Sequence, residues 1–435
     1  MTTFEDTIFA VSSGRPPSGV AVVRISGPAA AATARAVCGD LPAPRLACYR
    51  AMRDPASGEV LDRGLVLYFP GPASATGEDT VELHLHGGRA VVAAVLRALG
   101  TLPGLRTAEA GEFTRRALAN GKLDLAEVEG LADLVAAETE AQRRQALALA
   151  SGALSRRIGS WRAALVRALA LVEASIDFSD EGDVPDDLVA EALGAIAPLL
   201  GEIAAAVRDG ARGERVREGL TVAIVGPPNA GKSTLLNRLA GREAAIVSPL
   251  PGTTRDVLEV HLELAGQAVV LLDTAGLRES DDLVEQEGVR RARARAEAAD
   301  LVLWLSDGGE EPPEALARAI RVRTKTDLSK ATVPAGWIGL SAQTGEGVEA
   351  LLACLEADAE RLGGGEPALV SRARQRRALS EALGHLERAH GAFAGREELR
   401  AEELRLAARA LDRVIGRIDV EDILDALFRT FCIGK

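Results

Sequence analysis

The segment that decides the fold is GPPNAGKST (226–234). It follows the apolar run TVAIV (221–225) and precedes LLNRLA (235–240), so a buried strand leads into a glycine loop and then into a helix. The pattern G-x-x-x-x-G-K-[ST] requires this context. Gly226 and Gly231 let the backbone N–H groups turn inward, where they and the helix N-terminus can hold a β-phosphate. The segment therefore predicts a P-loop nucleotide-binding domain.

Two side chains of this loop have predicted roles at the phosphates. Lys232 brings a compact positive charge to the β- and γ-phosphates, and Ser233 offers a hydroxyl to Mg²⁺. We therefore expect Lys232 to act in catalysis. The loop residues predicted to contact the nucleotide are Asn229, Ala230, Gly231, Lys232, Ser233 and Thr234.

Further motifs of a GTP-hydrolysing domain follow in order, each at a predicted strand end. Asp273 to Gly276 (DTAG) follows a buried strand and predicts a Mg²⁺-side aspartate, with Gly276 sensing the γ-phosphate. GTTRD (252–256) predicts a loop in which Thr253 and Thr254 close on Mg²⁺ and the γ-phosphate. The chain is therefore predicted to be a GTPase of the P-loop class.

The guanine base is predicted to lie against TKTD (324–327). The carboxylate of Asp327 can accept both guanine donors, N1–H and N2–H₂, and Lys325 belongs to the same motif. Ser341 and Ala342 end the next strand and can offer a backbone N–H to guanine O6. This motif usually opens with Asn, whose side chain ties the loop to the P-loop and touches the base, whereas this chain has Thr324. We expect specificity for guanine to depend on Asp327.

The group that activates the attacking water is less evident. Leu277 stands where Ras-like enzymes carry a water-orienting glutamine, and no arginine finger can be identified. The amide oxygen of Asn229 could hold a monovalent cation where a finger would lie. The acidic residues after the switch could orient the water, although a solvated helix end is the favoured explanation for any one of them. They are Glu279, Asp281, Asp282, Glu285 and Glu287.

The rest of the chain changes character around the GTPase segment. Residues 1–120 are predicted to form a mixed α/β N-terminal domain, with strands at 20–26, 64–69 and 80–86 and a helix at 90–100. Residues 121–215 and 363–435 are rich in Ala, Leu, Glu and Arg and predict one helical domain. Residues 216–362 alternate strands and helices. The predicted fold is therefore multidomain, α/β and all-α, with a Ras-like P-loop GTPase domain inserted into the helical domain.

Composition narrows the possible partners and compartment. The net charge of −12 argues against a chain coated in nucleic acid or held on an anionic membrane. No uninterrupted apolar run approaches the roughly 18 residues of a spanning helix, and the first residues lack a signal pattern. The four cysteines form no C-x-x-C pair. We expect a cytoplasmic protein without a membrane partner.

Lysine is scarce in this chain: only five of the 51 basic residues are lysines. Arg and Lys differ in shape and hydration, so a site that needs a compact ammonium retains lysine. The lysines are therefore candidate functional residues, although chance explains Lys330. They are Lys122, Lys232, Lys325, Lys330 and Lys435.

Short motifs along the whole chain resemble the MnmE (TrmE) family of tRNA modification GTPases. They extend from RISG (24–27) to the C-x-G-K pattern of residues 432–435. The others are TGED (76–79), HGG (86–88), GEFT (111–114), KLDLAE (122–127), IDF (176–178), GREAAIVSPLPGTTRDV (241–257) and DTAGLRE (273–279).

The resemblance implies a reaction and its partners. With an FAD-containing MnmG-type protein, the family adds a carboxymethylaminomethyl or aminomethyl group to C5 of the wobble uridine of certain tRNAs. The N-terminal domain forms a homodimer and binds 5-formyl- or methylene-tetrahydrofolate. The family's folate contacts fall here on Arg24, Glu82, Lys122 and Lys435.

The resemblance also implies roles in hydrolysis. The family's water-orienting glutamate falls on Glu285, and its K⁺ site falls on Asn229 with the loop 248–253. The loop residues in that K⁺ site are Ser248, Leu250 and Thr253. The family cysteine falls on Cys432, for which packing is favoured over covalent chemistry.

Two other classes of protein remain open from the sequence. A ribosome-assembly GTPase shares the nucleotide motifs but needs no folate domain or C-x-G-K. A switch module that only recruits partners would be consistent with Leu277 and slow basal turnover. Two arginine runs could contact tRNA phosphates, although a solvated helix face is the favoured explanation for each. They are Arg290, Arg291, Arg293 and Arg295, and Arg372, Arg374, Arg376 and Arg377.

Overall fold

The protein is described here by a computed structural model. The structure describes residues 4–177, 188–242, 245, 259–273, 298–328, 332–391, 393, 396–418, 424, 427–428, 431 and 433–434. The chain forms two compact units, Met1–Ala132 with Asp412–Lys435, and Asp133–Leu411.

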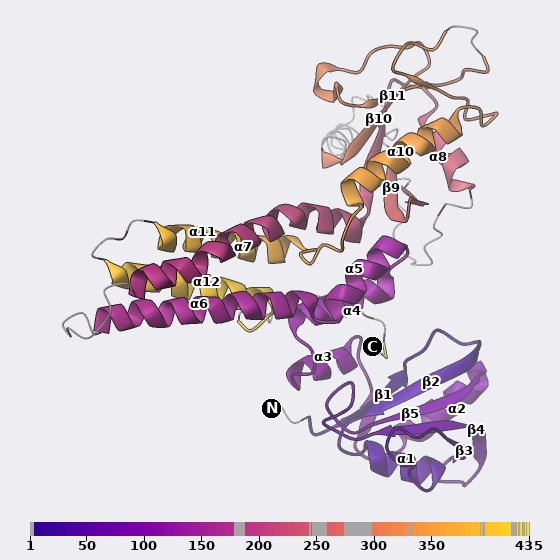
Figure 1. Ribbon diagram of the computed structural model, residues 1–435. Helices are drawn as coiled ribbons and strands as arrows, with labels where there is room; N and C mark the ends of the chain where they lie inside the picture. Colours follow the sequence, from indigo (N-terminus) through magenta and orange to yellow (C-terminus); the bar gives the residue numbers. More distant parts are fainter. Residues whose placement is uncertain are drawn as a thin grey trace, which may run out of the picture. The chain divides into compact units, whose positions relative to one another are not determined.

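The first unit contains a six-stranded sheet in the order β3-β4-β5-β2-β1-β6 (Figure 1). Its strands pair antiparallel except β1 and β6, which are parallel. Alternate residues of β2 and β5, among them Val23 and Leu83, are fully buried, as the two-residue period of a half-covered sheet requires. The elements are β1 (Thr7–Val11), β2 (Ser18–Ser26), α1 (Ala30–Cys38), β3 (Cys48–Arg53), β4 (Val60–Phe69), β5 (Thr80–Gly87), α2 (Arg89–Gly100) and β6 (Leu105–Thr107).

The three strands and the helix expected in this domain are present as β2, β4, β5 and α2. The strands β1, β3 and β6 were not expected. β6 has only three residues, and β3 is CYRAMR, in which two arginines interrupt the other residues, so neither gives an apolar run. Sheet pairing rather than local sequence therefore defines β3 and β6, whereas β1 is TIFAV, an apolar run that could have indicated a strand.

A small apolar cluster joins the two sequence segments of this unit. Leu125 and Val128 of α4 (Leu125–Ala136) pack with Phe428 and Phe431 from the end of the chain. α3 (Glu112–Ala119) precedes α4. The last part of the chain thus shares a core with residues near 125.

The second unit contains a bundle of four long helices (Figure 1). α7 packs against α6 and α11. Ion pairs connect α12 to both of its neighbours, since Arg405 lies 2.7 Å from Glu173 of α6 and His385 of α11 lies 2.6 Å from Glu403. The helices are α6 (Ala153–Asp177), α7 (Leu188–Glu218), α11 (Ala373–His390) and α12 (Glu397–Val414). α7 continues to Glu218, three residues beyond the predicted helical segment 121–215.

One bundle helix, α7, is long and apolar enough by composition to cross a membrane. Its most apolar window is 22% buried, and the buried positions Ala192, Ile196, Leu199 and Ile203 form one stripe toward the bundle. A bundle helix of a soluble domain passes the same test. The expectation based on uninterrupted apolar runs did not identify this helix as long enough to span a membrane, because Glu191 and Glu202 interrupt its apolar residues.

The inserted α/β domain has a six-stranded sheet in the order β12-β11-β10-β7-β9-β8. Among its described strands, β8 and β9 pair antiparallel, through a hairpin at Ala265-Gly266, where both residues have a positive φ. α8 and α10 pack against the sheet, whose apolar strands are buried. The elements are β7 (Leu220–Val225), α8 (Lys232–Ala240), β8 (Glu259–Leu264), β9 (Gln267–Asp273), β10 (Leu301–Ser306), β11 (Ile320–Arg323), β12 (Ile338–Gly339) and α10 (Val348–Gly363), with a short 3₁₀ turn at Glu314–Leu316.

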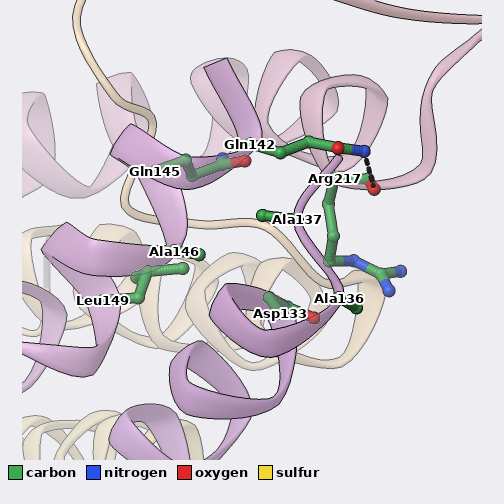
Figure 2. A pocket seen from close by; sticks show the side chains of 8 residues that line it. All are labelled: Asp133, Ala136, Ala137, Gln142, Gln145, Ala146, Leu149 and Arg217. Carbon is green, nitrogen blue, oxygen red and sulfur yellow. Dashed lines mark hydrogen bonds between the residues drawn. The ribbon is translucent and has the colours of Figure 1, made fainter. Parts of the chain in front are cut away.

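Helix α5 (Glu140–Ala150) contacts both connections between the bundle and the inserted domain, one near residues 213–217 and the other near residue 368. Buried Gln145 donates from Nε2 to the carbonyl oxygens of Gly213 and Ala368, at 3.2 and 3.0 Å. Gln142 donates to the carbonyl of Arg217 at 3.2 Å (Figure 2). A cavity of about 150 Å³ lies beside these contacts, and its lining residues are Asp133, Ala136, Ala137, Gln142, Gln145, Ala146, Leu149 and Arg217.

Candidate functional site

The P-loop lies between β7 and α8, and its backbone follows from its glycines. Gly226 and Gly231 have φ of 157° and 88°, which favour glycine. A Cβ on Gly226 would lie 2.1 Å from the carbonyl oxygen of Leu305 in the neighbouring strand, so no side chain fits there. Asn229 also has a positive φ, 62°, which Asn tolerates better than most residues. The loop thus has the curled backbone that phosphate binding needs.

Lys232 extends back over this loop. Its Nζ donates to the carbonyl oxygens of Gly226 and Pro227 at 2.8 and 2.9 Å, and the residue is 9% exposed. Burial lowers the pKa of the ammonium below its usual value, while the carboxylate of Asp273 opposes this shift. An ammonium that donates to carbonyl oxygens can exchange them for the more strongly charged oxygens of a phosphate.

Ser233 and Asp273 form the polar pair expected beside a Mg²⁺ ion. Ser233 Oγ donates to Asp273 Oδ2 at 2.9 Å, across the 40 residues that separate them in sequence. They meet because β7 and β9 are parallel neighbours whose carboxyl ends share one edge of the sheet. A hydroxyl and a carboxylate are oxygen ligands that suit Mg²⁺, so the residues present fit this ion.

The base-binding loop is anchored to the P-loop. Thr324 is 3% exposed, and its Oγ1 donates to the carbonyl oxygen of Ala230 at 2.7 Å. Lys325 has φ of 56° and its Nζ lies 2.8 Å from Asp307 Oδ2. This hydrogen bond and charge hold the pKa of Asp307 below its usual value. Asp327 is exposed, as a residue that reads a ligand base should be.

Ser341 and Ala342 follow β12 at the same edge of the sheet. The N–H of Ser341 donates to the carbonyl of Glu346 at 2.9 Å, and its Oγ accepts from the N–H of Thr344. Because the Ser341 N–H is engaged inside its own loop, the predicted bond to guanine O6 falls to Ala342. Asp307 was not expected from the sequence. Its place at the end of the strand-like run LVLWLSD was the signal that could have identified it.

Several predicted site residues lie outside the described residues. They are Ser248, Leu250, Thr253, Thr254, Gly276, Leu277, Glu285, Cys432 and Lys435, together with the arginines Arg290, Arg291, Arg293 and Arg295 and the acidic residues Glu279, Asp281, Asp282 and Glu287. Asn229 is the described member of the predicted K⁺ site. The assignments of these residues stay predictions.

In the first unit, Arg24 and Glu82 face each other across β2 and β5. They are Cα partners in the register, and Arg24 donates to Glu82 Oε1 from Nε and Nη2 at 3.1 and 2.9 Å. The guanidinium also lies 5.7 Å from the centre of the Phe113 ring. His84, which was not expected, lies 3.4 Å from Glu82 Oε2. The period of two along TVELHLH places Glu82 and His84 on one face and could have indicated it.

Lys122 lies beside the TGED segment. Asn120 Nδ2 donates to the carbonyl of Thr76 at 2.8 Å, and a Cβ on Gly77 would lie 3.2 Å from Lys122 Cγ. Thr76 Oγ1 in turn lies 2.7 Å from Ser26 Oγ, which shares a strand face with Arg24 two residues earlier. A chain of contacts thus connects the neighbourhoods of Arg24 and Lys122.

The end of the chain lies against this unit's sheet. Ile433 forms an antiparallel bridge with Ala110, and Ser12 Oγ donates to the carbonyl of Gly434 at 2.7 Å. Gly434 has φ of 100°, and a Cβ there would lie 1.9 Å from the carbonyl oxygen of Val11. We call residues 431–435 the tail. Its described residues require glycine at 434.

A buried ionic network that the sequence did not reveal supports this region. Arg116 and Glu112 are fully buried and paired at 3.1 Å, and Arg116 also bonds Asp6 and Glu78. Burial raises the pKa of Glu112, but hydrogen bonds from Arg106, the Glu109 N–H and Arg116 outweigh it, so the pKa lies below its usual value. The motifs GEFT and TGED therefore meet through Glu112, Arg116 and Glu78.

Two residues of the described arginine run are committed to ion pairs. Arg372 lies 2.6 Å from Asp133, and Arg376 bonds both carboxylate oxygens of Glu214 at 2.9 and 3.1 Å. These pairs favour a structural role for both residues over phosphate contact.

Comparison with known proteins agrees with this geometry. Two family models match, "GTP-binding protein TrmE N-terminus" over residues 7–122 and "MnmE helical domain" over residues 125–432. The tRNA modification GTPase MnmE of Azorhizobium caulinodans is 67% identical over 435 residues, covering all of both chains. That of Parvibaculum lavamentivorans is 59% identical and covers 99% of this chain and all of its own.

Proposed function

This chain belongs to the MnmE family of tRNA modification GTPases, and from that premise we propose that it acts on the wobble uridine of certain tRNAs. In this proposal it works with an FAD-containing MnmG-type partner to add a carboxymethylaminomethyl or aminomethyl group to C5. The observation that carries the proposal is that one chain holds both a P-loop site and the Arg24–Glu82 cluster beside the tail.

At the nucleotide, the chain's own groups bind GTP and orient its γ-phosphate. Lys232 exchanges the carbonyls of Gly226 and Pro227 for the β- and γ-phosphate oxygens, while Asp327 and Ala342 hold the base. Ser233, Thr254 and Asp273 hold Mg²⁺, which neutralises charge on the phosphate oxygens. Glu285 orients the attacking water, and Gly276 reads the γ-phosphate. Thr253 and Lys325 make the remaining proposed contacts with the nucleotide.

We further propose that hydrolysis depends on K⁺ held by Asn229 with Ser248, Leu250 and Thr253. The position of Asn229 supports this, because the residue lies within the P-loop, has a positive φ and is exposed. The test is GTP turnover at fixed ionic strength in K⁺ and in Na⁺, for wild type and Asn229→Ala. Equal rates in K⁺ and Na⁺ for wild type, or a K⁺ response that survives in Asn229→Ala, contradict this assignment.

The N-terminal cluster suits a reduced folate, the proposed one-carbon source. The glutamate tail of a folate offers carboxylates to Arg24, Lys122 and Lys435, and its pterin ring offers N–H donors to Glu82. Arg24 and Glu82 bond each other in the structure, so Arg24 can exchange this carboxylate for one of the folate tail, and Glu82 can exchange the guanidinium for pterin N–H donors.

A homodimer through the N-terminal domain is part of the proposal. Tyr49 and Leu65 are cross-strand partners that are 62% and 41% exposed, and Val20 is 56% exposed. An exposed apolar cross-strand pair such as Tyr49–Leu65 can contribute to a contiguous interaction surface. We propose a cytoplasmic protein with tRNA and the MnmG-type protein as partners and no membrane contact.

The experiment that tests the function is mass analysis of wobble uridines from cells lacking the gene. Return of the modified uridine with the wild-type gene, and its absence with Lys232→Ala, supports the proposal. Unaltered uridines in the deletion strain would instead leave a ribosome-assembly or recruitment role.

A further inference from the structure

The side chain of Thr324 has a single hydrogen to donate, and the structure shows where it goes. Oγ1 lies 2.7 Å from the carbonyl oxygen of Ala230, which can only accept a hydrogen bond, so the hydroxyl hydrogen points at the P-loop. The contact is buried, and breaking it would leave a carbonyl without this donor. The Thr324 hydroxyl is therefore committed to the P-loop.

The backbone of this loop is fixed independently of that hydroxyl. The N–H of Thr324 donates to the carbonyl of Ser306 at 2.9 Å, and the N–H of Thr326 donates to Leu340 at 3.4 Å. Lys325 is held by its ion pair with Asp307. A change of side chain at position 324 therefore alters the set of hydrogen-bond donors more than the path of the loop.

An asparagine amide at this position would carry two hydrogens instead of one. One could keep the bond to Ala230, and the other could reach the guanine ring, whose N7 is an acceptor. We propose that Thr324 sets the nucleotide affinity of this protein, because its only hydrogen holds the P-loop and leaves guanine N7 without a donor from this position. Guanine is then recognised through the Watson–Crick edge of the base, which Asp327 and Ala342 read, and not through N7.

The test compares GDP with 7-deaza-GDP, which lacks the N7 acceptor, on the full-length protein. Dissociation constants are measured for wild type, Thr324→Asn and Thr324→Ser. We expect wild type to bind both nucleotides equally within about twofold. Thr324→Asn should bind GDP about tenfold more tightly than wild type does, because one added hydrogen bond contributes about that much. It should bind 7-deaza-GDP with the same affinity as wild type.

Thr324→Ser is the matched control, because it keeps the hydroxyl and loses only a methyl group. It should resemble wild type with both nucleotides. Wild-type discrimination against 7-deaza-GDP of about tenfold would overturn the proposal, because a donor already reaches N7. So would a Thr324→Asn variant that is folded, as judged by its melting temperature, and binds GDP no more tightly than wild type.

Discussion

The nucleotide site and the N-terminal polar cluster are assembled in different ways. The groups around the P-loop come from the carboxyl ends of neighbouring parallel strands, as Ser233 and Asp273 do after β7 and β9. Arg24 and Glu82 instead project from the middle of two antiparallel strands, where register places them opposite each other. The first arrangement needs only the order of strands, whereas the second needs their exact alignment to a single residue.

This difference teaches that the two sites can be disturbed separately. The described residues of the P-loop site all belong to the unit Asp133–Leu411, and the N-terminal cluster belongs to the other unit. A substitution at a strand end should affect GTP and leave folate binding unchanged, and one in the cluster should affect folate binding and leave GTP unchanged. The first two predictions below concern the nucleotide site, and the last two concern the N-terminal unit.

The largest effect is expected for Lys232→Ala. Loss of the ammonium removes the fixed charge at the β- and γ-phosphates, so GTP hydrolysis should fall by about 10³-fold or more. Single-turnover measurement with saturating enzyme gives the rate. Lys232→Arg is the matched control and should rescue little, because a planar guanidinium differs in shape from the compact ammonium that the carbonyls of Gly226 and Pro227 hold. Retention of a tenth of wild-type turnover by Lys232→Ala contradicts the assignment.

Asp327→Asn should change base preference by about 100-fold. The amide presents a donor where guanine also presents donors, so GTP should bind more weakly and xanthine nucleotides more tightly. Competition binding with GDP and XDP measures the ratio. Asp307→Asn is the control, since Asp307 pairs with Lys325 and does not read the base. An unchanged preference in Asp327→Asn would show that the base is read elsewhere.

A smaller effect is expected for Arg24→Ala, about tenfold weaker binding of 5-formyl-tetrahydrofolate. Calorimetric titration of the intact protein measures it, with GTP affinity measured on the same sample. Arg63, on β4 of the same sheet, provides a surface control, and Arg63→Ala should bind folate as wild type does. If Arg24→Ala weakens GTP as well, the two sites are not separable.

The smallest effect concerns pH and the buried pair Glu112–Arg116. The pKa of Glu112 is lowered in the folded protein, so this carboxylate contributes stability that is present above its unfolded pKa and is lost as pH falls through the folded value. Glu112→Gln should lower the melting temperature at pH 7, and its difference from wild type should shrink toward pH 4. Glu140→Gln is the control, because Glu140 pairs with Arg143 on the surface. A difference that stays constant with pH would exclude this contribution.

The two sites also differ in how far sequence could predict them. The P-loop, Asp273 and the hairpin at Ala265-Gly266 could be placed because local motifs mark strand ends and turns. Arg24 and Glu82 were reached only through family resemblance, because 58 residues separate them and no local pattern gives their register. The network of Arg116 with Asp6, Glu78 and Glu112 was missed for the same reason. Burial of a charge depends on partners that the fold brings together.

The contact between Ser12 and Gly434 joins positions 422 residues apart, and this affects the order in which the protein can assemble during synthesis. The inserted domain is continuous in sequence, so the ribosome can release all of its strands before the tail exists. The N-terminal sheet can form early, but the cluster of Leu125 and Val128 waits for Phe428 and Phe431. Closing so long a loop is slow. The first domain to emerge is thus the last to be completed, and a nascent chain can hold nucleotide before its N-terminal surface is finished.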